Sequence, residues 1–455
     1  MADIVLTHGY FLEDDEKEQR IMRPYPPLGL LYVAAWLRKH GKEVAVFDTT
    51  FSTSELLKAY LVEEKPSILC LYVNLMTRPE IVRLLQWVRA ELSDTRIVLG
   101  GPEVRYSADE FLQHGADFIV LGEGEETCLE LVEHLQTDLE PMNVKGLVYK
   151  DRTGHIHKTG EREKMRNLDE LPLPARDLID MDLYLQAWKK AHGKHAISVN
   201  TMRGCPYTCK WCSRAVYGLS YRRRSPESVV EELLHIKKTY APDILWFVDD
   251  VFTVSHKWLE AFADAVVNAN AVIPFECITR ADRMNEKVVQ LLKKSGCFRV
   301  WIGAESGSQQ VIDLMDRRVD VHQVRDMIRL TREHGMEAGT FIMLGYPGER
   351  EEDIQETVRH LISSQPDHFT ITLAYPIRGT ELYEETKDSF VHPPDWAQGT
   401  DRHIDFKRTY PRPYYDHAIR YVVNRVESSR TNGLRSVKHR IKAAVAKGGM
   451  VWHSN

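Results

Sequence analysis

The segment RGCPYTCKWC at residues 203–212 places three cysteines within eight residues, directly after the strand-like run AISVNT at 196–201. Three and then two residues separate the thiols of Cys205, Cys209 and Cys212. Cysteines this close together are typical of metal ligands and not of core packing. Zinc would require a fourth protein ligand at a typical spacing, yet the nearest histidines are His195 and His235. An iron–sulfur cluster, with one iron left without a protein ligand, fits three thiols better.

Strand-like and helix-like segments alternate on the carboxyl side of this loop. The strand-like runs lie at 196–201, 244–250, 275–280, 299–305, 337–344 and 368–375. Short apolar runs that alternate with helices predict parallel βα units, and six of them predict a partial (βα)6 barrel. Chemistry in such barrels takes place at the carboxyl ends of the strands, where the cysteine loop stands.

An earlier series of βα units precedes this barrel. Its strand-like runs lie at 3–8, 43–48, 67–73, 96–100 and 117–122. Five runs rich in Val, Ile and Leu, separated by helix-like segments, predict a doubly wound, flavodoxin-like parallel sheet in an α/β protein. Ligands of such sheets bind beyond the carboxyl ends of the strands, and in this chain those ends carry Gly100-Gly101-Pro102 and Gly122-Glu123-Gly124-Glu125.

These changes of pattern divide the chain into four parts. We expect the first sheet over residues 1–140, a hairpin and an extended linker over 141–194, the barrel over 195–383, and a small, mostly helical C-terminal region over 384–455 that could cover the substrate. The last 28 residues contain no Asp or Glu and six Lys or Arg. They predict a solvated basic helix or a frayed tail, with contact to an anionic substrate or a membrane surface as the alternative.

Composition excludes several classes of protein. Of 455 residues, 43% are apolar and 28% charged, and the net charge is −6, so no overall field attracts nucleic acid. No apolar run approaches the ~20 residues of a membrane span, and the N-terminus lacks a signal-peptide pattern, which favours a cytoplasmic location. Seven cysteines, an odd number, do not predict a disulfide framework. We expect the four outside the loop to be buried structural thiols: Cys70, Cys128, Cys277 and Cys297.

The C-x3-C-x2-C loop, with Trp211 before its third cysteine, resembles the radical S-adenosylmethionine (SAM) superfamily, and the likeness extends over residues 195–380. It implies a [4Fe-4S] cluster on the three cysteines and SAM across the barrel mouth. The FVDDVF segment at 247–252 is similar to a motif of cobalamin-linked members. The implied SAM contacts are Trp211, Asp249, Asp250, Arg280, Glu305, Ser306, Gly345 and Pro347. Taken singly, these residues have structural alternatives: the aspartates could cap a helix, Arg280 could pair with Asp282 or Glu276, and the glycines could serve turns.

The glycines at the strand ends of the first sheet, together with the segment PPLGLLY at 26–32, resemble the cobalamin-binding domain of class B radical SAM enzymes. The implied cobalamin contacts are Asn74, Leu75, Met76, Thr77, Gly100, Gly101, Pro102, Glu123, Gly124 and Glu125. An accessory α/β domain without cobalamin is the alternative. The chain lacks the Asp-x-His-x-x-Gly spacing that supplies a lower cobalt ligand in many cobalamin folds, so we do not expect His8 to bind cobalt. Leu75, Met76 and Thr77 are expected to face the lower side of the corrin.

The resemblance implies an enzyme that cleaves SAM to a 5′-deoxyadenosyl radical and methylates an unactivated carbon of a small-molecule substrate, with flavodoxin or ferredoxin as reductant. One alternative is oxidative cyclisation or rearrangement, as in the anaerobic Mg-protoporphyrin monomethyl ester cyclase. An RNA methylthiotransferase is more distant, because it needs three further N-terminal cysteines, so no nucleic acid partner is expected. A cobalamin-responsive regulator would not need the cysteine loop. Three consecutive arginines, Arg222, Arg223 and Arg224, could hold an anion, although a solvated turn is the simpler interpretation.

Overall fold

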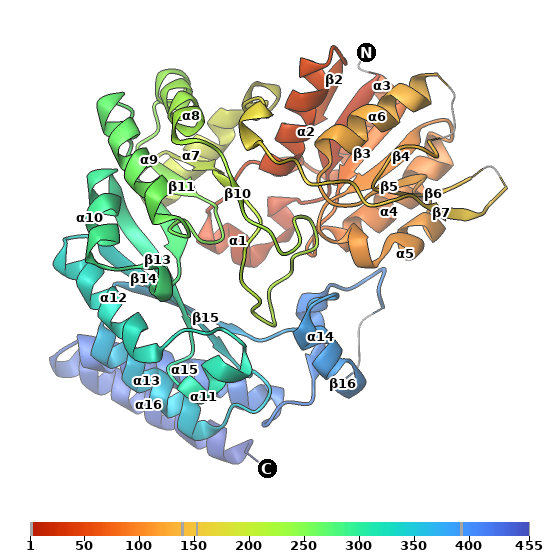
Figure 1. Ribbon diagram of the computed structural model, residues 1–455. Coiled ribbons are helices and arrows are strands. Elements are labelled where there is room, and N and C mark those ends of the chain that lie inside the picture. Colours follow the sequence, from red (N-terminus) through yellow and green to blue (C-terminus); the bar gives the residue numbers. More distant parts are fainter. Residues whose placement is uncertain (1–2, 138–140, 152, 392–394, 455) are drawn as a thin grey trace.

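The computed structural model describes residues 3–137, 141–151, 153–391 and 395–454. Two sheets, each with helices packed against it, form the body of the molecule, and a helical C-terminal region packs against the second sheet (Figure 1). The fold class expected from the sequence is confirmed: a flavodoxin-like sheet, then a half-barrel, then helices. The expected end of the first part at residue 140 lies outside the described residues.

The first sheet has the strand order β2-β1-β3-β4-β5-β6-β7. Its parallel strands are β1 (Ile4–His8), β2 (Val44–Phe47), β3 (Ile68–Tyr72), β4 (Arg96–Gly100) and β5 (Phe118–Val120). The order 2-1-3-4-5 is that of flavodoxin, in which ligands bind where the direction of winding reverses, between β1 and β3. The hairpin expected in the connector consists of β6 (Leu147–Lys150) and β7 (Ile156–Lys158), and it extends this sheet in the antiparallel sense.

Helices cover both faces of the first sheet. One face packs against α3 (Ser54–Glu64), α4 (Arg78–Glu91) and α5 (Ala108–Gln113), and the other against α2 (Leu28–Lys39) and α6 (Glu125–Gln136). Because the strands are buried on both faces, they are continuous apolar runs, which is why the sequence located them. The charged loop after β1 contains a short helix that the sequence analysis did not expect, α1 (Glu16–Ile21).

The second sheet contains six parallel strands in the order β15-β14-β13-β12-β11-β8. They are β8 (Ala196–Val199), β11 (Ile244–Phe247), β12 (Phe275–Thr279), β13 (Cys297–Glu305), β14 (Glu337–Leu344) and β15 (His368–Leu373). The helices between them are α8 (Pro226–Thr239), α9 (His256–Asn268), α10 (Glu286–Lys294), α11 (Gln309–Leu314), α12 (Val321–Glu333) and α13 (Glu351–Ser364). A small antiparallel pair, β9 (Met202–Arg203) and β10 (Arg222–Arg223), flanks the cysteine loop.

The expected extended linker between the two sheets contains a helix, α7 (Met181–His192). This helix contacts the first part of the chain through two polar side chains. The Tyr184 hydroxyl donates to Asp48 at 2.6 Å, and the Trp188 indole N–H donates to the Pro24 carbonyl at 2.7 Å. Buried hydrogen bonds of this kind fix the orientation of one sheet against the other.

The C-terminal region is more regular than its sequence indicated. After α14 (Glu381–Thr386) and a short strand pair, β16 (Phe390–Val391) and β17 (Asp405–Phe406), the chain forms α15 (Arg412–Arg430) and α16 (Gly433–Trp452). For the last 28 residues, the expected basic helix is present as α16, in which Arg435, Lys438, Arg440 and Lys442 are exposed. The alternative of a frayed tail is wrong, because buried side chains of α15 and α16 join the core of the half-barrel. In the part of the chain that the structure describes, no helix is long and apolar enough to cross a membrane.

Candidate active site

The cysteine loop leaves the first strand of the half-barrel and is fixed by Asp249, at the end of β11. The Asp249 carboxylate accepts hydrogen bonds from the amides of Thr201 at 2.7 Å and Met202 at 3.2 Å, and Arg223 pairs with it at 3.2 Å. Gly204 begins the loop with a φ of +84°, and a Cβ there would lie 2.6 Å from the Ser220 carbonyl oxygen. Asp249 is buried and its oxygens are occupied by these contacts, so it positions the loop.

The three thiols line one cavity of about 400 Å³ at the carboxyl ends of the half-barrel strands. Cys209 is buried, Cys205 is half-buried and Cys212 is exposed. In the described residues, no three His, Cys, Asp or Glu side chains converge closely enough to bind a single metal ion. Among the described residues that line this cavity there is no fourth Cys or His, so the three thiols fit the donor set of a multi-iron cluster better than a closed zinc site.

Two arginines donate to the sulfur of Cys209. The Nη1 atoms of Arg280 and Arg317 each lie 3.6 Å from its Sγ. The pKa of Cys209 is held below its ordinary value by a hydrogen bond with Cys212 and by these guanidinium groups. Positive charge beside a thiol stabilises the thiolate, which is the form that binds iron.

Each of these arginines is fixed by contacts beyond the sulfur. Arg280 donates to Asp282 at 2.8 Å and to the Arg317 carbonyl at 2.8 Å, and it stacks over the Tyr207 ring. The pairing with Asp282 was the structural alternative for this residue, and the structure contains it together with the contact to Cys209. Arg317 donates to the Gly303 carbonyl at 3.0 Å.

Arg317 was not among the site residues expected from the sequence. It follows α11 in the segment DRRVD at 316–320, away from any strand end, so its position in the chain gives no signal of a role in the site.

Glu305, at the end of β13, faces the same cavity. Its carboxylate lies 3.6 Å from Arg317, and burial raises its pKa. Its φ of +65° is uncommon for a residue with a side chain, and it coincides with an irregular register between β13 and β14. At Gly303, a Cβ would lie 2.3 Å from the Arg317 guanidinium, so glycine leaves space for this side chain in its observed position.

Of the other expected SAM contacts, some line the thiol cavity and some do not. Asp250 lines the cavity, with a pKa raised by burial and by the neighbouring Asp249, and Trp211 lines it as well. Ser306, Gly345 and Pro347 are not among its lining residues. The Ser306 hydroxyl accepts from the Ser308 amide at 3.1 Å, and the Gly345 amide donates to Glu349 at 2.6 Å.

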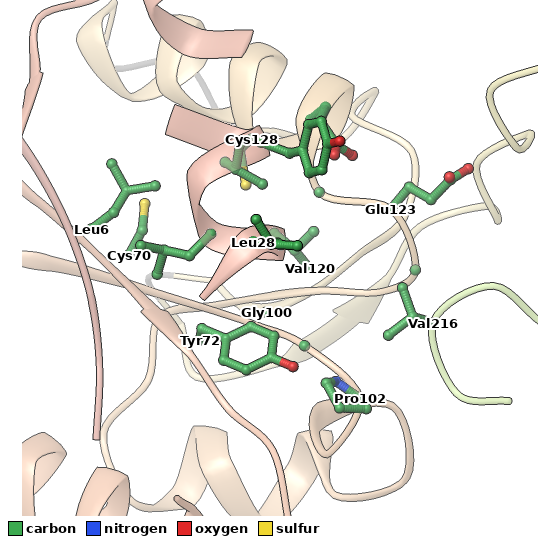
Figure 2. A pocket seen from close by; sticks show the side chains of 18 of the residues that line it. Leu6, Leu28, Cys70, Tyr72, Gly100, Pro102, Val120, Glu123, Cys128 and Val216 are labelled. Carbon is green, nitrogen blue, oxygen red and sulfur yellow. The ribbon is translucent and has the colours of Figure 1, made fainter. Parts of the chain in front are cut away.

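A second cavity, of about 300 Å³, lies at the carboxyl ends of the first sheet (Figure 2). Its walls are mainly apolar, and Figure 2 shows Leu6, Cys70, Val120 and Cys128 around it. The expected cobalamin contacts that line it are Gly100, Gly101, Pro102, Glu123, Gly124 and Glu125.

Two glycines of this cavity keep space open. A Cβ at Gly29 would meet no atom closer than 3.9 Å, from Tyr72, and a Cβ at Gly100 none closer than 3.9 Å, from Val120. Neither glycine is required by packing, so the missing side chains enlarge the cavity. An open, apolar cavity of this size with glycine walls fits a flat ring appended to a macrocycle.

Glu123 and Glu125 line this cavity, but their carboxylates are paired with arginines. Glu123 lies 2.9 Å from Arg203 and 2.6 Å from Arg222, and Glu125 forms an ion pair with Arg203. Arg203 ends β9 and directly precedes the cysteine loop, so these pairs join the first sheet to the start of the loop.

The interpretation of the three consecutive arginines as a solvated turn is wrong. Arg224 is buried and pairs with Glu232, and the other two pair with Glu123 and Asp249. Arg222 is engaged only through Nη1, and its buried Nε and Nη2 have no hydrogen-bond partner among the described residues.

A third cavity, of about 610 Å³, adjoins the second and includes Asn74, Met76 and Thr77. The Asn74 side chain accepts from the amides of Met76 at 2.9 Å and Thr77 at 3.1 Å, which shapes the turn into α4. Leu75 is half-buried and lines neither this cavity nor the second.

His8 also lines the third cavity, but both of its ring nitrogens are engaged. Nε2 lies 2.9 Å from Asp48, and Nδ1 accepts from the Tyr10 amide at 3.2 Å. A nitrogen that accepts a hydrogen bond has no lone pair left for a metal.

The four cysteines outside the loop, Cys70, Cys128, Cys277 and Cys297, are buried, as the sequence predicted.

Known proteins match both halves of the chain. A model described as the radical SAM superfamily matches residues 199–361, and a model described as a B12 binding domain matches residues 21–132. An uncharacterised methyltransferase of Pyrococcus horikoshii is 30% identical over 368 residues, which covers 79% of this chain and 78% of that protein. The chain belongs to the cobalamin-binding radical SAM family. Its expected enzyme class is therefore confirmed, as are the cofactors of that class: a [4Fe-4S] cluster, SAM and cobalamin.

Other relatives of the family share most of the length. The anaerobic magnesium-protoporphyrin IX monomethyl ester cyclase of Synechocystis is 25% identical, over 86% of this chain and 78% of its own. The hopanoid C-3 methylase of Methylococcus capsulatus is 28% identical, over 78% of this chain and 68% of its own. The solved structure of OxsB with aqua-cobalamin and SAM bound has the same fold, with a TM-score of 0.76 at 16% identity, covering 98% of this chain and 71% of that one.

Proposed function

We propose that this chain transfers a methyl group to an unactivated carbon of a small molecule, as a cobalamin-dependent radical SAM methyltransferase. One observation carries the proposal: the cavity that holds the three thiols adjoins the glycine-lined cavity of the first sheet. Pro102, Val216 and Tyr217 line both. A group that generates a radical and a group that donates methyl could therefore act on one substrate between them. Relatives named as methyltransferases over most of this chain support the same conclusion.

When bound, the cluster with SAM supplies a radical that abstracts hydrogen, and cobalamin supplies the methyl group. The contribution of this chain is to bind and orient these groups. Cys205, Cys209 and Cys212 would hold the cluster. Arg280 and Arg317 would stabilise the Cys209 thiolate through the two 3.6 Å contacts.

Three acidic or cationic groups around the thiol cavity are suited to hold SAM, which carries an ammonium and a carboxylate. Glu305 and Asp250 line the cavity and would accept hydrogen bonds from the ligand. Arg280 lines the same cavity and would meet the carboxylate of the ligand. The space left by Gly29 and Gly100 would admit cobalamin to the neighbouring cavity. The ion pairs of Arg203 with Glu123 and Glu125 would fix the position of the two cavities relative to each other.

The test is the stoichiometry of SAM products in the anaerobically reconstituted holoenzyme. With small-molecule fractions that contain the substrate and with reduced flavodoxin or ferredoxin, methylation requires two SAM molecules per product. We expect 5′-deoxyadenosine and S-adenosylhomocysteine in near-equal amounts, and label from deuteromethyl SAM in the product. 5′-Deoxyadenosine without S-adenosylhomocysteine and without label would refute methylation.

Oxidative cyclisation or rearrangement is the second candidate. The cyclase relative aligned over 86% of this chain favours it, because both cofactor regions are included in that alignment. Such a reaction needs SAM only for hydrogen abstraction. The labelling experiment separates the two candidates without knowledge of the substrate structure.

A further inference from the structure

The outer face of α16 carries a stripe of exposed apolar side chains. The exposed fractions are 89% for Leu434, 60% for Ile441, 70% for Val445 and 82% for Trp452, and Val437 is exposed as well. Spacings of three, four, four and seven residues place all five on one face of the helix, because an α-helix turns by about 100° per residue. We refer to these five residues as the α16 stripe.

The stripe is not the face by which α16 packs on the protein. That face consists of the buried residues Ser436, Ala443, Ala446 and Met450, and it lies against α15 and the half-barrel core. In a helix on a protein surface, the face toward solvent is normally polar. Contiguous exposed apolar side chains on the outward face indicate a surface that binds another protein or a membrane. Figure 1 shows α16 beside α15 at the outer edge of the molecule.

Basic residues border the stripe on both sides. At about 100° per residue, Lys438 and Lys442 lie along one edge and Arg440 lies along the other. In the described part of the chain, no ion pair involves Arg435, Lys438, Arg440 or Lys442, whereas Lys447 is paired with Glu351. No Asp or Glu occurs in residues 428–455, although the whole chain has a net charge of −6. The helix is therefore a local cationic surface with an apolar centre.

We propose that α16 docks this protein on an anionic lipid surface. Helices that lie in the membrane interface place apolar side chains at the boundary of the acyl chains and let Lys and Arg reach the headgroups. Each basic residue near an anionic surface adds to the attraction, and four to eight of them on an amphipathic helix are typical of binding to acidic lipids. The basic residues in α16 prevent it from crossing the bilayer, so it would lie on the surface.

Other occupants fit the stripe less well. A second copy packed on α16 would bring the flanking cations of both copies together, and they would repel. A standard protein interface uses about 20–30 residues a side, and a stripe of five side chains does not supply that many. Nucleic acid would meet apolar side chains where its phosphates require cations.

The experiment measures binding of the full chain to vesicles by co-sedimentation. The two vesicle compositions are pure phosphatidylcholine and a mixture of about one part phosphatidylglycerol to three parts phosphatidylcholine. We expect binding to the anionic vesicles to be about tenfold stronger or more, and to weaken as salt is added. The variant Leu434→Gln/Ile441→Gln/Val445→Gln and the variant Lys438→Gln/Lys442→Gln should each lose about tenfold in binding.

Matched control variants test whether binding depends on α16 or on any exposed leucine or lysine of the chain. Leu56→Gln removes an exposed leucine of α3, and Lys190→Gln/Lys257→Gln removes two exposed lysines elsewhere. Both should bind the vesicles like the wild type. Circular dichroism and the Tm of each variant verify its fold. The substituted side chains of α16 are exposed, so folding should be unchanged.

Four results would overturn the proposal. The first is wild-type binding no stronger to anionic than to neutral vesicles. The second is equal binding by the stripe variant, with its fold intact. The third is a dimer in light scattering that the stripe variant converts to monomer, which would assign the stripe to a second copy. A labelled oligonucleotide bound through Lys438 and Lys442 more tightly than the vesicles would also refute it.

Discussion

Arg317 donates to the sulfur of Cys209 across 108 residues of sequence, at 3.6 Å. The contact connects the loop after α11 to the cysteine loop after β8, and it places a permanent cation on one of the three candidate cluster ligands. It exists because Gly303 leaves room for the guanidinium. The environment of the cluster site therefore depends on residues that carry no recognisable motif.

The three loop cysteines should account for all bound iron. We expect about four irons per reconstituted chain, since one set of three thiolates can hold one cubane. The triple Cys→Ala variant at 205, 209 and 212 should lose the iron, its visible absorbance and SAM cleavage. Single Cys→Ala changes at the buried Cys70, Cys128, Cys277 and Cys297 are the controls and should retain the iron. Iron retained by the triple variant would contradict the assignment.

Arg317→Met should lower the reduction potential of the cluster. The variant removes one hydrogen bond and one positive charge from a ligand sulfur. The hydrogen bond and the charge both stabilise the reduced cluster, so their loss lowers the potential. A hydrogen bond of ~1 kcal/mol corresponds to a shift on the order of 50 mV for one electron. The measurement is a redox titration followed by EPR. Arg317→Lys should restore part of the potential, and Arg318→Met, at an exposed neighbour, should not change it. An unchanged potential in Arg317→Met would rule out this role.

Glu305→Gln should weaken SAM binding by about tenfold without loss of iron. The change preserves the volume of the side chain but removes the charge that faces the cavity, and one hydrogen bond to a charged group has about this effect. Equilibrium dialysis measures the affinity, and iron analysis measures the cluster. Glu337→Gln, on the exposed start of β14, is the control. Loss of iron in Glu305→Gln would assign the residue a structural role instead.

The EPR spectrum of bound cob(II)alamin should lack nitrogen superhyperfine splitting from a histidine. His8 lines the third cavity, and no other histidine among the described residues lines the second or the third. Asp48 and the Tyr10 amide occupy both of its ring nitrogens. His8→Ala should leave the spectrum unchanged, although the loss of a buried hydrogen bond should lower the Tm. Splitting that is present in the wild type and absent in His8→Ala would show that His8 binds cobalt.

Glu349→Gln should stabilise the apo chain at pH 8. Burial raises the pKa of Glu349 to about 8, so the folded state holds a proton that the unfolded state loses near pH 4.5. The free energy of unfolding therefore falls as the pH rises from about 5 to 8, because the folded state binds more protons than the unfolded state over this range. Glutamine removes this dependence, and the gain at pH 8 should be about 1–3 kcal/mol, decreasing toward pH 5. The measurement is the Tm of Glu349→Gln and of the wild type as a function of pH, with Glu352→Gln, at an exposed position, as the control. An equal Tm difference at pH 5 and pH 8 would contradict the assignment.

Features that depend on a few neighbouring residues could be predicted from the sequence. The eleven parallel strands that were expected in the two βα series are close to those observed, because a strand buried on both faces is a short apolar run between turns. α7, α15 and α16 were missed or underestimated. Packing of their buried side chains against the half-barrel core stabilises these helices, and that packing is a contact between distant segments.

The sequence by itself determined the two α/β parts, the three thiols of the cysteine loop and the glycines at the strand ends, since each is a local pattern with a local physical cause. Only the tertiary structure decided which charges meet. Arg203 pairs with Glu125 across 78 residues, and Arg317 reaches Cys209 across 108. It also decided which face of α16 is exposed, because that depends on how α15 and α16 pack on the half-barrel. Contacts between distant segments are set by the packing of whole elements, and no spacing of residues along the chain encodes them.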